Sequence, residues 1–254
     1  MSSLQLRRIP PFLLIGASFL LGALPGLRGS AFRGLRPRVL LLGVYGLFTY
    51  HLCLFTALRA GPPVETNLIN YLWPLLMVVL TPLILPGCAL KPRHLVGALL
   101  GFCGAALLVT GGSPGSFAGR ALGYGLALAA AVIWSTYSLL TKRVGDFPTE
   151  TVAVFCLASG ALSLACHAAF ESRYLFVGSD GPWLLYMGLG PFGAAFYLWD
   201  RAVKDGDPRA IGTLAYLTPL LSTLWLVLFG AGRLSAASAI AAALIVGGAA
   251  IGGR

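Results

Sequence analysis

The sequence predicts an all-α protein, a polytopic bundle of helices that each cross a lipid bilayer. Charged residues make up 10% of the 254 residues, whereas apolar and aromatic types make up 57%. Soluble domains carry roughly 25% charged residues, so a soluble fold of this length would expose one continuous apolar surface. The mean hydropathy of +0.85 agrees. A transmembrane β-barrel would need alternating apolar and polar positions, and the apolar runs here are unbroken.

Nine apolar runs mark the expected spans, because a helix needs about 20 apolar residues to cross the hydrocarbon core. In chain order they lie near residues 11–27, 38–58, 66–87, 92–112, 121–141, 149–170, 182–200, 210–230 and 234–252. The charged or Gly/Pro-rich breaks between them lie near 28–38, 59–65, 88–93, 112–120, 142–147, 171–180, 201–209 and 231–233. The first run follows two arginines, as a secretory signal does, but lacks a clear cleavage site, so we interpret it as a true span.

An internal repeat relates the two halves at an offset of 145 residues. Tyr-Leu-Trp-Pro-Leu-Leu at 71–76 recurs as Tyr-Leu-Thr-Pro-Leu-Leu at 216–221. The same offset pairs Ala57 with Ala202, Arg59 with Lys204, Gly61 with Gly206, Pro63 with Pro208, Leu83 with Leu228 and Gly87 with Gly232. The Tyr, Pro and Gly pairs indicate an old duplication, with a first repeat at 1–112 and a second at 121–254.

The two repeats differ in their number of expected helices. The second repeat has five and the first has four, because the run at 121–141 has no counterpart after Met1. We therefore expect a ten-helix fold of which nine helices are present and the first is absent. A lost helix, a start codon placed too late and a shortened chain would each account for the difference.

The distribution of Lys and Arg predicts the orientation. One side of the nine spans holds twelve of these residues and the other holds six, and the richer side is expected to be cytoplasmic. The C-terminus then lies inside. Repeats of five spans each would be inverted relative to one another, which is a transporter architecture with its site near the midplane.

Several functions are excluded by what the sequence lacks. The net charge is +10, but Lys and Arg form no basic stripe beside aromatic residues, so nucleic-acid binding is not expected. The cysteines form no C-x-x-C pair and no cluster with histidine, so neither a metal nor a disulfide is expected. No H-E-x-x-H or G-x-x-x-x-G-K-[ST] motif occurs, and no G-x-S-x-G nucleophile elbow is expected, because Gly-Gly-Ser-Pro-Gly at 111–115 lies in a Gly/Ser-rich loop. We expect no enzyme and no cofactor, and any transport must be secondary or passive.

Polar and aromatic residues inside the spans are the candidate site. In the third span Asn67, Asn70, Tyr71 and Pro74 follow the spacing of one helix face, and Trp73 flanks that face. Trp73 lies seven residues into the span, about 10 Å along the axis, which is deep for an interfacial aromatic residue. We expect it to line a cavity, with interhelical packing as the alternative. The asparagines could instead bond neighbouring helices.

Other spans contribute similar residues. The fifth carries Trp134, the eighth Tyr216, and the second Tyr50 and His51. For His51 three roles stay open: packing, substrate contact and proton coupling. Asp200, near the end of the seventh span, is expected to be solvated or to cap a loop.

Two prolines and a glycine row have structural roles. Pro74 and Pro219 occupy equivalent places in the repeats and each removes a helical hydrogen bond, so a kink or a broken segment is expected at both. Gly97, Gly101 and Gly104 are expected to form a close-packing face.

The third span also resembles a known family. Asn-Tyr-Leu-Trp-Pro at 70–74, preceded by Gly-Pro-Pro at 61–63, resembles the EamA-type exporters of the drug/metabolite transporter superfamily, and more narrowly their aromatic amino-acid exporter branch. Ile-Trp-Ser-Thr-Tyr at 133–137 fits the start of the second EamA repeat, and Tyr-Leu-Thr-Pro at 216–219 fits the helix after it. The similarity covers the chain from the first span onward.

The resemblance implies ten helices in two inverted repeats, cytoplasmic termini and a central cavity that opens alternately to each side. The chain departs from the family in the absence of the first helix. Carried over to this chain, the substrate-binding positions are Tyr50, His51, Asn70, Tyr71, Trp73, Pro74, Trp134 and Tyr216.

Physical chemistry and the resemblance indicate the same partner, an aromatic or other bulky apolar amino acid. Trp and Tyr offer ring faces for stacking and a quadrupole for the ammonium group. No Lys or Arg lies mid-span, so the carboxylate should meet amide, hydroxyl or imidazole donors. We expect a monomer in the bacterial inner membrane that exports such molecules by alternating access. The alternatives are export of another metabolite or drug, a non-transporting membrane scaffold and a passive channel.

Overall fold

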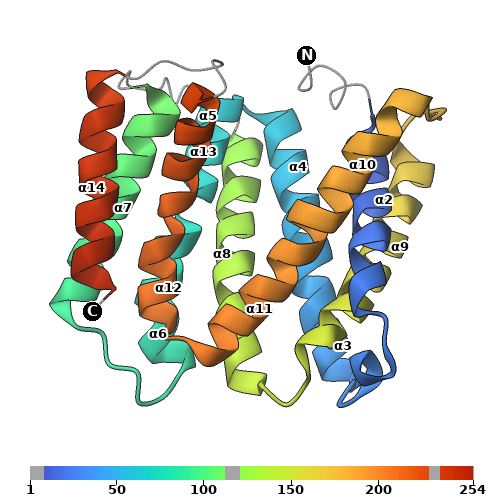
Figure 1. The fold of residues 1–254 in the computed structure, drawn as a ribbon, viewed down its shortest axis with the longest axis horizontal. Coiled ribbons are helices and arrows are strands. Elements are labelled where there is room, and N and C mark those ends of the chain that lie inside the picture. The colour runs from blue at the N-terminus through green and yellow to red at the C-terminus, as the bar shows by residue number, and fades with distance from the viewer. Residues whose placement is uncertain (1–8, 112–120, 229–234, 254) are drawn as a thin grey trace. The chain divides into compact units, whose positions relative to one another are not determined.

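The structure, a computed structural model, describes residues 9–111, 121–228 and 235–253, and every regular element in these ranges is a helix (Figure 1). The predicted all-α class is confirmed. One to three consecutive helical elements occupy each of the nine expected spans. The expected ends at residues 112, 230 and 234 lie outside the described ranges.

The helices follow one another along the chain with only short connections. They are α2 (Pro11–Ala23), η1 (Leu24–Gly26), η2 (Gly29–Phe32), α3 (Pro37–Val44), η3 (Tyr45–Thr49), α4 (Tyr50–Ala60), α5 (Pro63–Asn70), α6 (Trp73–Ile84), α7 (Pro92–Thr110), α8 (Ala121–Val144), η4 (Thr149–Thr151), α9 (Val152–Phe170), η5 (Gly178–Asp180), α10 (Gly181–Leu189), η6 (Gly190–Ala194), α11 (Ala195–Asp205), α12 (Pro208–Ala215), α13 (Leu217–Leu228) and α14 (Ala236–Gly252). The elements η3 and η6 are π-helical, and the other η elements are 3-10 turns.

Five helical stretches are long and apolar enough to cross a bilayer. They contain 19 to 24 residues and run over Pro37–Ala60, Pro63–Ile84, Pro92–Thr110, Ala121–Val144 and Thr149–Phe170. Two shorter apolar stretches, Pro11–Gly26 and Ala236–Gly252, lie near the two ends of the described chain. Length and composition therefore agree with a multi-pass membrane protein.

The 145-residue offset of the sequence repeat also relates the boundaries of helices. The π-helical turn η3 at Tyr45–Thr49 corresponds to η6 at Gly190–Ala194. The short helix α5 at Pro63–Asn70 corresponds to α12 at Pro208–Ala215. A π-helical turn is rare, so its presence at equivalent positions supports a duplication more strongly than matching leucines do.

The chain forms two compact units that do not coincide with the two sequence halves. Unit 1 contains Met1–Leu52 and Val144–Lys204, and unit 2 contains Cys53–Arg143 and Asp205–Arg254. Each unit thus combines segments from both halves. The division into a first repeat at 1–112 and a second at 121–254 stays a prediction about ancestry.

In unit 2 the most extensive helix contact is between α7 and α14 (Figure 1). A Cβ atom on Gly97 would lie 2.7 Å from the carbonyl oxygen of Gly248, and one on Gly104 would lie 2.8 Å from that of Ala241. The partners run in opposite order along the two helices, so α7 and α14 are antiparallel. The close-packing face predicted on α7 is confirmed at both glycines, because only a residue without a Cβ allows this approach.

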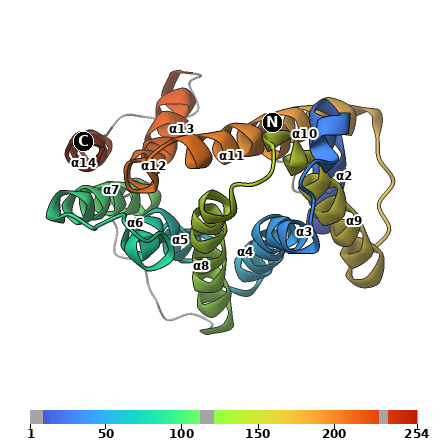
Figure 2. The ribbon, with the colours of Figure 1, turned by 90° about the horizontal axis from the view of Figure 1, so that it is seen from below.

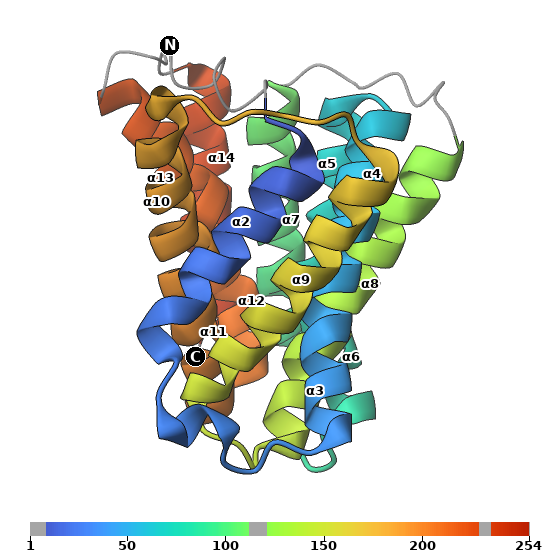
Figure 3. The same cartoon turned by 90° about the vertical axis from the view of Figure 1, so that its right-hand side faces the viewer.

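In unit 1 the most extensive contact is between α2 and α9, which also run antiparallel (Figure 3). A Cβ atom on Gly16 would lie 3.1 Å from the carbonyl oxygen of Gly160. At the far end of the pair, the Glu171 carboxylate accepts the backbone N–H groups of Phe12 at 3.1 Å and Leu13 at 3.3 Å. These N–H groups have no partner within α2, so Glu171 serves as a cap supplied by the neighbouring segment.

Unit 1 also contains a buried ion pair at the end of α11. Asp200 is 1% exposed, and its Oδ2 accepts from Lys204 Nζ at 2.8 Å and from Thr149 Oγ1 at 2.7 Å. Lys204 also donates to the carbonyl oxygen of Phe147 at 2.8 Å and lies 3.6 Å from the centroid of its ring. Of the two roles expected for Asp200, solvation was wrong, because the segment after α8 folds over it, which the sequence position alone does not reveal.

We expect Gly248→Ala to lower the melting temperature of the purified protein, whereas Gly247→Ala should leave it unchanged or raise it. A Cβ on Gly248 would lie 2.6 Å from the carbonyl oxygen of Gly97, but none of the described atoms lies within 4 Å of a Cβ on Gly247. Overpacking costs about 1–3 kcal/mol, while Ala in place of a helical Gly gains up to about 1 kcal/mol. Equal melting temperatures for the two variants would contradict this packing.

We expect Asp200→Asn to destabilise the protein and a second substitution, Lys204→Met, to restore part of the loss. The single variant leaves the Lys204 ammonium without its buried counter-charge, a change that costs up to roughly 3–5 kcal/mol. The double variant removes the charge itself. Melting temperatures of the three proteins test this, and a double variant less stable than the single one would count against it.

Candidate functional site

The third predicted span is interrupted at its centre. The helix α5 ends at Asn70 and α6 begins at Trp73, with a two-residue turn between them. Pro74 lies in the first turn of α6, where its missing N–H costs no helical hydrogen bond. It could not continue α5, because its ring would clash with the carbonyl group of Asn70, four residues earlier. The break predicted at Pro74 is therefore present, and the single helix face expected for this span ends at Asn70.

The equivalent span of the second half is interrupted in the same place. The helix α12 ends at Ala215 and α13 begins at Leu217, so the break consists of Tyr216 alone. The helix α12 packs against α6 and α7 within unit 2 (Figure 2). A Cβ atom on Gly212 would lie 2.9 Å from the carbonyl oxygen of Pro74, so the two interrupted helices meet closely at the first break.

Aromatic rings gather beside the first break. The rings of Trp73 and Trp134 meet edge to face, with centroids 6.3 Å apart and an interplanar angle of 88°. Tyr137 follows on α8, with its ring 5.4 Å from that of Trp134. Trp134 and Tyr137 are buried, whereas Trp73 is half-buried. We call Trp73, Trp134 and Tyr137 the Trp73 cluster.

Three other predicted site residues adjoin the first break. Asn70 is buried at the end of α5, and Tyr71 is half-buried in the turn that follows. Pro74 is buried in the first turn of α6. The structure therefore brings Asn70, Tyr71 and Trp73 together at one interruption, while α8 adds the ring of Trp134.

Tyr216 also reaches the first break, but its ring is buried among the packed helices of unit 2. It is 0% exposed, and its hydroxyl accepts the N–H group of Leu75 at 3.1 Å and donates to the carbonyl oxygen of Tyr71 at 3.2 Å. Gly101 makes room for the ring, since a Cβ there would lie 2.5 Å from Tyr216 Cδ2. In this structure, Tyr216 contacts the backbone of the site and not an open surface.

Tyr50 and His51 belong to unit 1, directly after the π-helical turn η3. His51 is 7% exposed, and its Nδ1 lies 2.6 Å from the carbonyl oxygen of Leu47, which can only accept a hydrogen bond. Nδ1 therefore carries the hydrogen. The rings of Tyr50, Phe19 and Phe192 have centroids 4.9 Å, 5.2 Å and 5.1 Å from the imidazole. These contacts support the packing role among the three that the sequence left open.

Sequence reasoning missed the partners that hold these residues. Phe19 and Phe192 lie in ordinary apolar runs and carry no signal that would distinguish them. Tyr197 closes another helix end, because its hydroxyl donates to the carbonyl oxygens of Gly22 at 3.1 Å and Ala23 at 3.3 Å. A tyrosine inside a span was the available signal, but its target 175 residues away could not be found without the fold.

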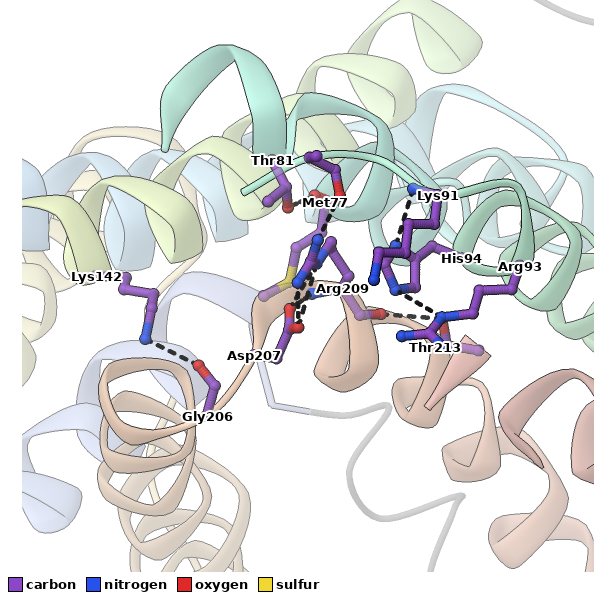
Figure 4. Close-up of polar contacts among 11 residues, drawn as sticks. Met77, Thr81, Lys91, Arg93, His94, Lys142, Gly206, Asp207, Arg209 and Thr213 are labelled. Atoms are coloured by element: carbon purple, nitrogen blue, oxygen red, sulfur yellow. Dashed lines mark hydrogen bonds and ion pairs between the residues drawn. The ribbon is translucent and has the colours of Figure 1, made fainter. Parts of the chain in front are cut away.

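Polar contacts also order the start of α12 (Figure 4). Asp207 Oδ1 accepts the backbone N–H group of Arg209 at 2.9 Å, and its carboxylate pairs with the Arg209 guanidinium at 2.6 Å. The hydrogen bond from this guanidinium lowers the pKa of the Asp207 carboxyl group. Arg209 also donates to the carbonyl oxygen of Ala89, and Lys142 donates to that of Gly206 at 2.8 Å. These contacts attach the α11–α12 connection to α8 and to the segment after α6.

Comparisons with known proteins relate this chain to a family of transporters. The EamA-like transporter family model matches residues 1–110 and again residues 121–252. The aromatic amino acid exporter YddG of Ancylobacter novellus is 46% identical over 252 residues, covering 96% of this chain and 88% of that protein. The aromatic amino acid exporter YddG of Escherichia coli is 25% identical over 205 residues, covering 72% of this chain and 66% of that protein.

One solved crystal structure has a TM-score of 0.90 to this chain at 46% identity, and the match covers 96% of this chain and 89% of the other. The fold is therefore shared with an experimentally determined structure over nearly the whole chain. The family model matches both halves, and both YddG relatives are named as exporters. This chain belongs to the EamA-like transporter family.

Proposed function

We propose that this protein is a secondary transporter that exports aromatic and other bulky apolar amino acids by alternating access. The observation that carries the proposal is the Trp73 cluster, in which a half-buried tryptophan at a helix break meets a buried second indole edge to face. The 46% identical relative, named as an aromatic amino acid exporter, supports the same substrate class.

The chemistry of the Trp73 cluster suits a zwitterion that carries a ring. The Trp73 ring offers a surface for offset or edge-to-face stacking, and its π face attracts an ammonium group. The amide of Asn70, at the end of α5, is the neighbouring group that we expect to meet the carboxylate. The site residues carry no full charge, so binding should be weak and the substrate should leave readily after transport.

The bacterial relatives support a place in the inner membrane, and the positive-inside rule supports a cytoplasmic C-terminus. In this proposal the protein acts as a monomer. The substrate's own gradient or an ion gradient drives export, since the sequence contains no nucleotide-binding motif.

We expect Trp73→Ala to raise the KM for phenylalanine or tryptophan about tenfold in proteoliposomes, because it removes both the stacking surface and the cation–π contact. Trp225→Ala is the matched control, since Trp225 is 63% exposed on α13 and should be dispensable. Transport of radiolabelled substrate measures both. Wild-type kinetics in Trp73→Ala would remove this residue from the site, and absence of aromatic transport by the wild type would refute the substrate class.

We expect Trp73→Leu to discriminate between substrates. Leu keeps an apolar side chain but loses the aromatic face, so the KM for phenylalanine should rise several-fold more than the KM for leucine. The ratio of the two KM values, measured for the variant and the wild type, isolates the contribution of ring stacking. An unchanged ratio would show that Trp73 contributes only bulk.

A further inference from the structure

Tyr71 and Tyr216 occupy the same position in the two sequence repeats, 145 residues apart, and each lies at a helix break. Their surroundings differ. Tyr216 is completely buried and its hydroxyl makes two hydrogen bonds, whereas Tyr71 is half-buried. Among the contacts of the described residues, the Tyr71 hydroxyl has no hydrogen bond. The breaks differ as well, since the first contains two residues and the second only one.

The Tyr216 hydroxyl bridges the two sides of the first break. It donates to the carbonyl oxygen of Tyr71, just after α5, and accepts from the N–H group of Leu75, in the first turn of α6. In an uninterrupted helix, these two backbone groups would bond directly to each other, because they are four residues apart. The hydroxyl therefore takes the place of one helical hydrogen bond and holds the break open.

The repeat relates each member of this bridge to a residue in the other half of the chain. Tyr216 corresponds to Tyr71, the Tyr71 carbonyl to the Tyr216 carbonyl, and Leu75 to Leu220. In a transporter with inverted repeats, the two end states differ by an exchange of conformation between the repeats. A contact that one repeat makes in one state should then be made by the other repeat in the opposite state.

We propose that Tyr71 and Tyr216 form an alternating latch that sets the direction in which the site faces. In the present structure, the Tyr216 hydroxyl bridges the α5–α6 break. In the oppositely facing state, the Tyr71 hydroxyl bridges the α12–α13 break, between the Tyr216 carbonyl and the Leu220 N–H group. This inference rests on the proposed alternating-access function, and makes Tyr216 a positioning residue that acts on Trp73 through the backbone.

The packing around Tyr216 allows its hydroxyl to be tested alone. The ring lies against Ala105 and Ile245, and the Phe102 ring meets it at 6.5 Å. Gly101 provides the space for it. Phenylalanine would fill the same space, so Tyr216→Phe should remove the two hydrogen bonds and keep the packing.

The experiment measures amide hydrogen exchange in Tyr216→Phe, Tyr71→Phe and the wild type, without substrate. Loss of the Tyr216 bridge should speed exchange about tenfold in the segment 71–76 and slow it in 216–221, because the population shifts to the opposite state. Tyr71→Phe should do the reverse, with slower exchange in 71–76 and faster exchange in 216–221. The opposite signs are the signature, since a purely structural tyrosine would only loosen its own surroundings.

Tyr186→Phe, on the exposed face of α10, is the control and should leave both segments unchanged. Melting temperatures close to that of the wild type would show that the variants are folded. Faster exchange of both segments in both variants, or no effect of Tyr71→Phe, would overturn the latch. The assay needs no substrate, so its failure is separate from a failure of the wild type to transport aromatic amino acids.

Discussion

The need to satisfy backbone hydrogen-bonding groups inside a bilayer governs this structure. A continuous helix satisfies these groups by itself, but every interruption leaves N–H and C=O groups that need another partner. This chain interrupts its helices repeatedly, and side chains take up several of the freed groups. Tyr216 bridges the α5–α6 break, Tyr197 closes the end of α2, and Glu171 caps its start.

The same constraint explains why the candidate site lies at the interruptions. Where a helix breaks or forms a π-helical turn, side chains leave the regular spacing and the backbone becomes available for binding. Trp73 follows the break after α5, and His51 follows the π-helical turn η3. The side chains that hydrogen-bond the free backbone groups are also best placed to control the site. A change in one of these hydrogen bonds alters the backbone geometry at the interruption directly.

Repeat symmetry appears in how helices pair within each unit. The helices α2 and α9 belong to different sequence halves, as do α7 and α14, yet each pair forms the most extensive contact of its unit. Both pairs are antiparallel and meet at glycines such as Gly16 and Gly97. An antiparallel contact between corresponding helices supports an inverted relation between the two halves, because a parallel repeat would place them side by side in the same direction.

The sequence alone determined the helical class, the positions of the spans and the break at Pro74. These follow from composition, hydropathy and the covalent structure of proline, all of which are local properties. It also proposed Trp73 and Trp134 as candidates for one site, Trp73 because it lies deep in its span and Trp134 through the family resemblance. The repeat at an offset of 145 residues was also visible in the sequence, because it consists of matching residue identities.

Only the tertiary structure decided which side chain satisfies which backbone group. The sequence offered solvent or a loop cap for Asp200, but a segment distant along the chain buries it beside Lys204. It offered Tyr216 as a substrate contact, whereas the fold directs its hydroxyl into the framework. The two hydrogen-bond partners of this hydroxyl lie 141 and 145 residues away along the chain, and sequence spacing does not identify them. A hydrogen bond needs a set distance and direction between donor and acceptor, and tertiary packing provides both.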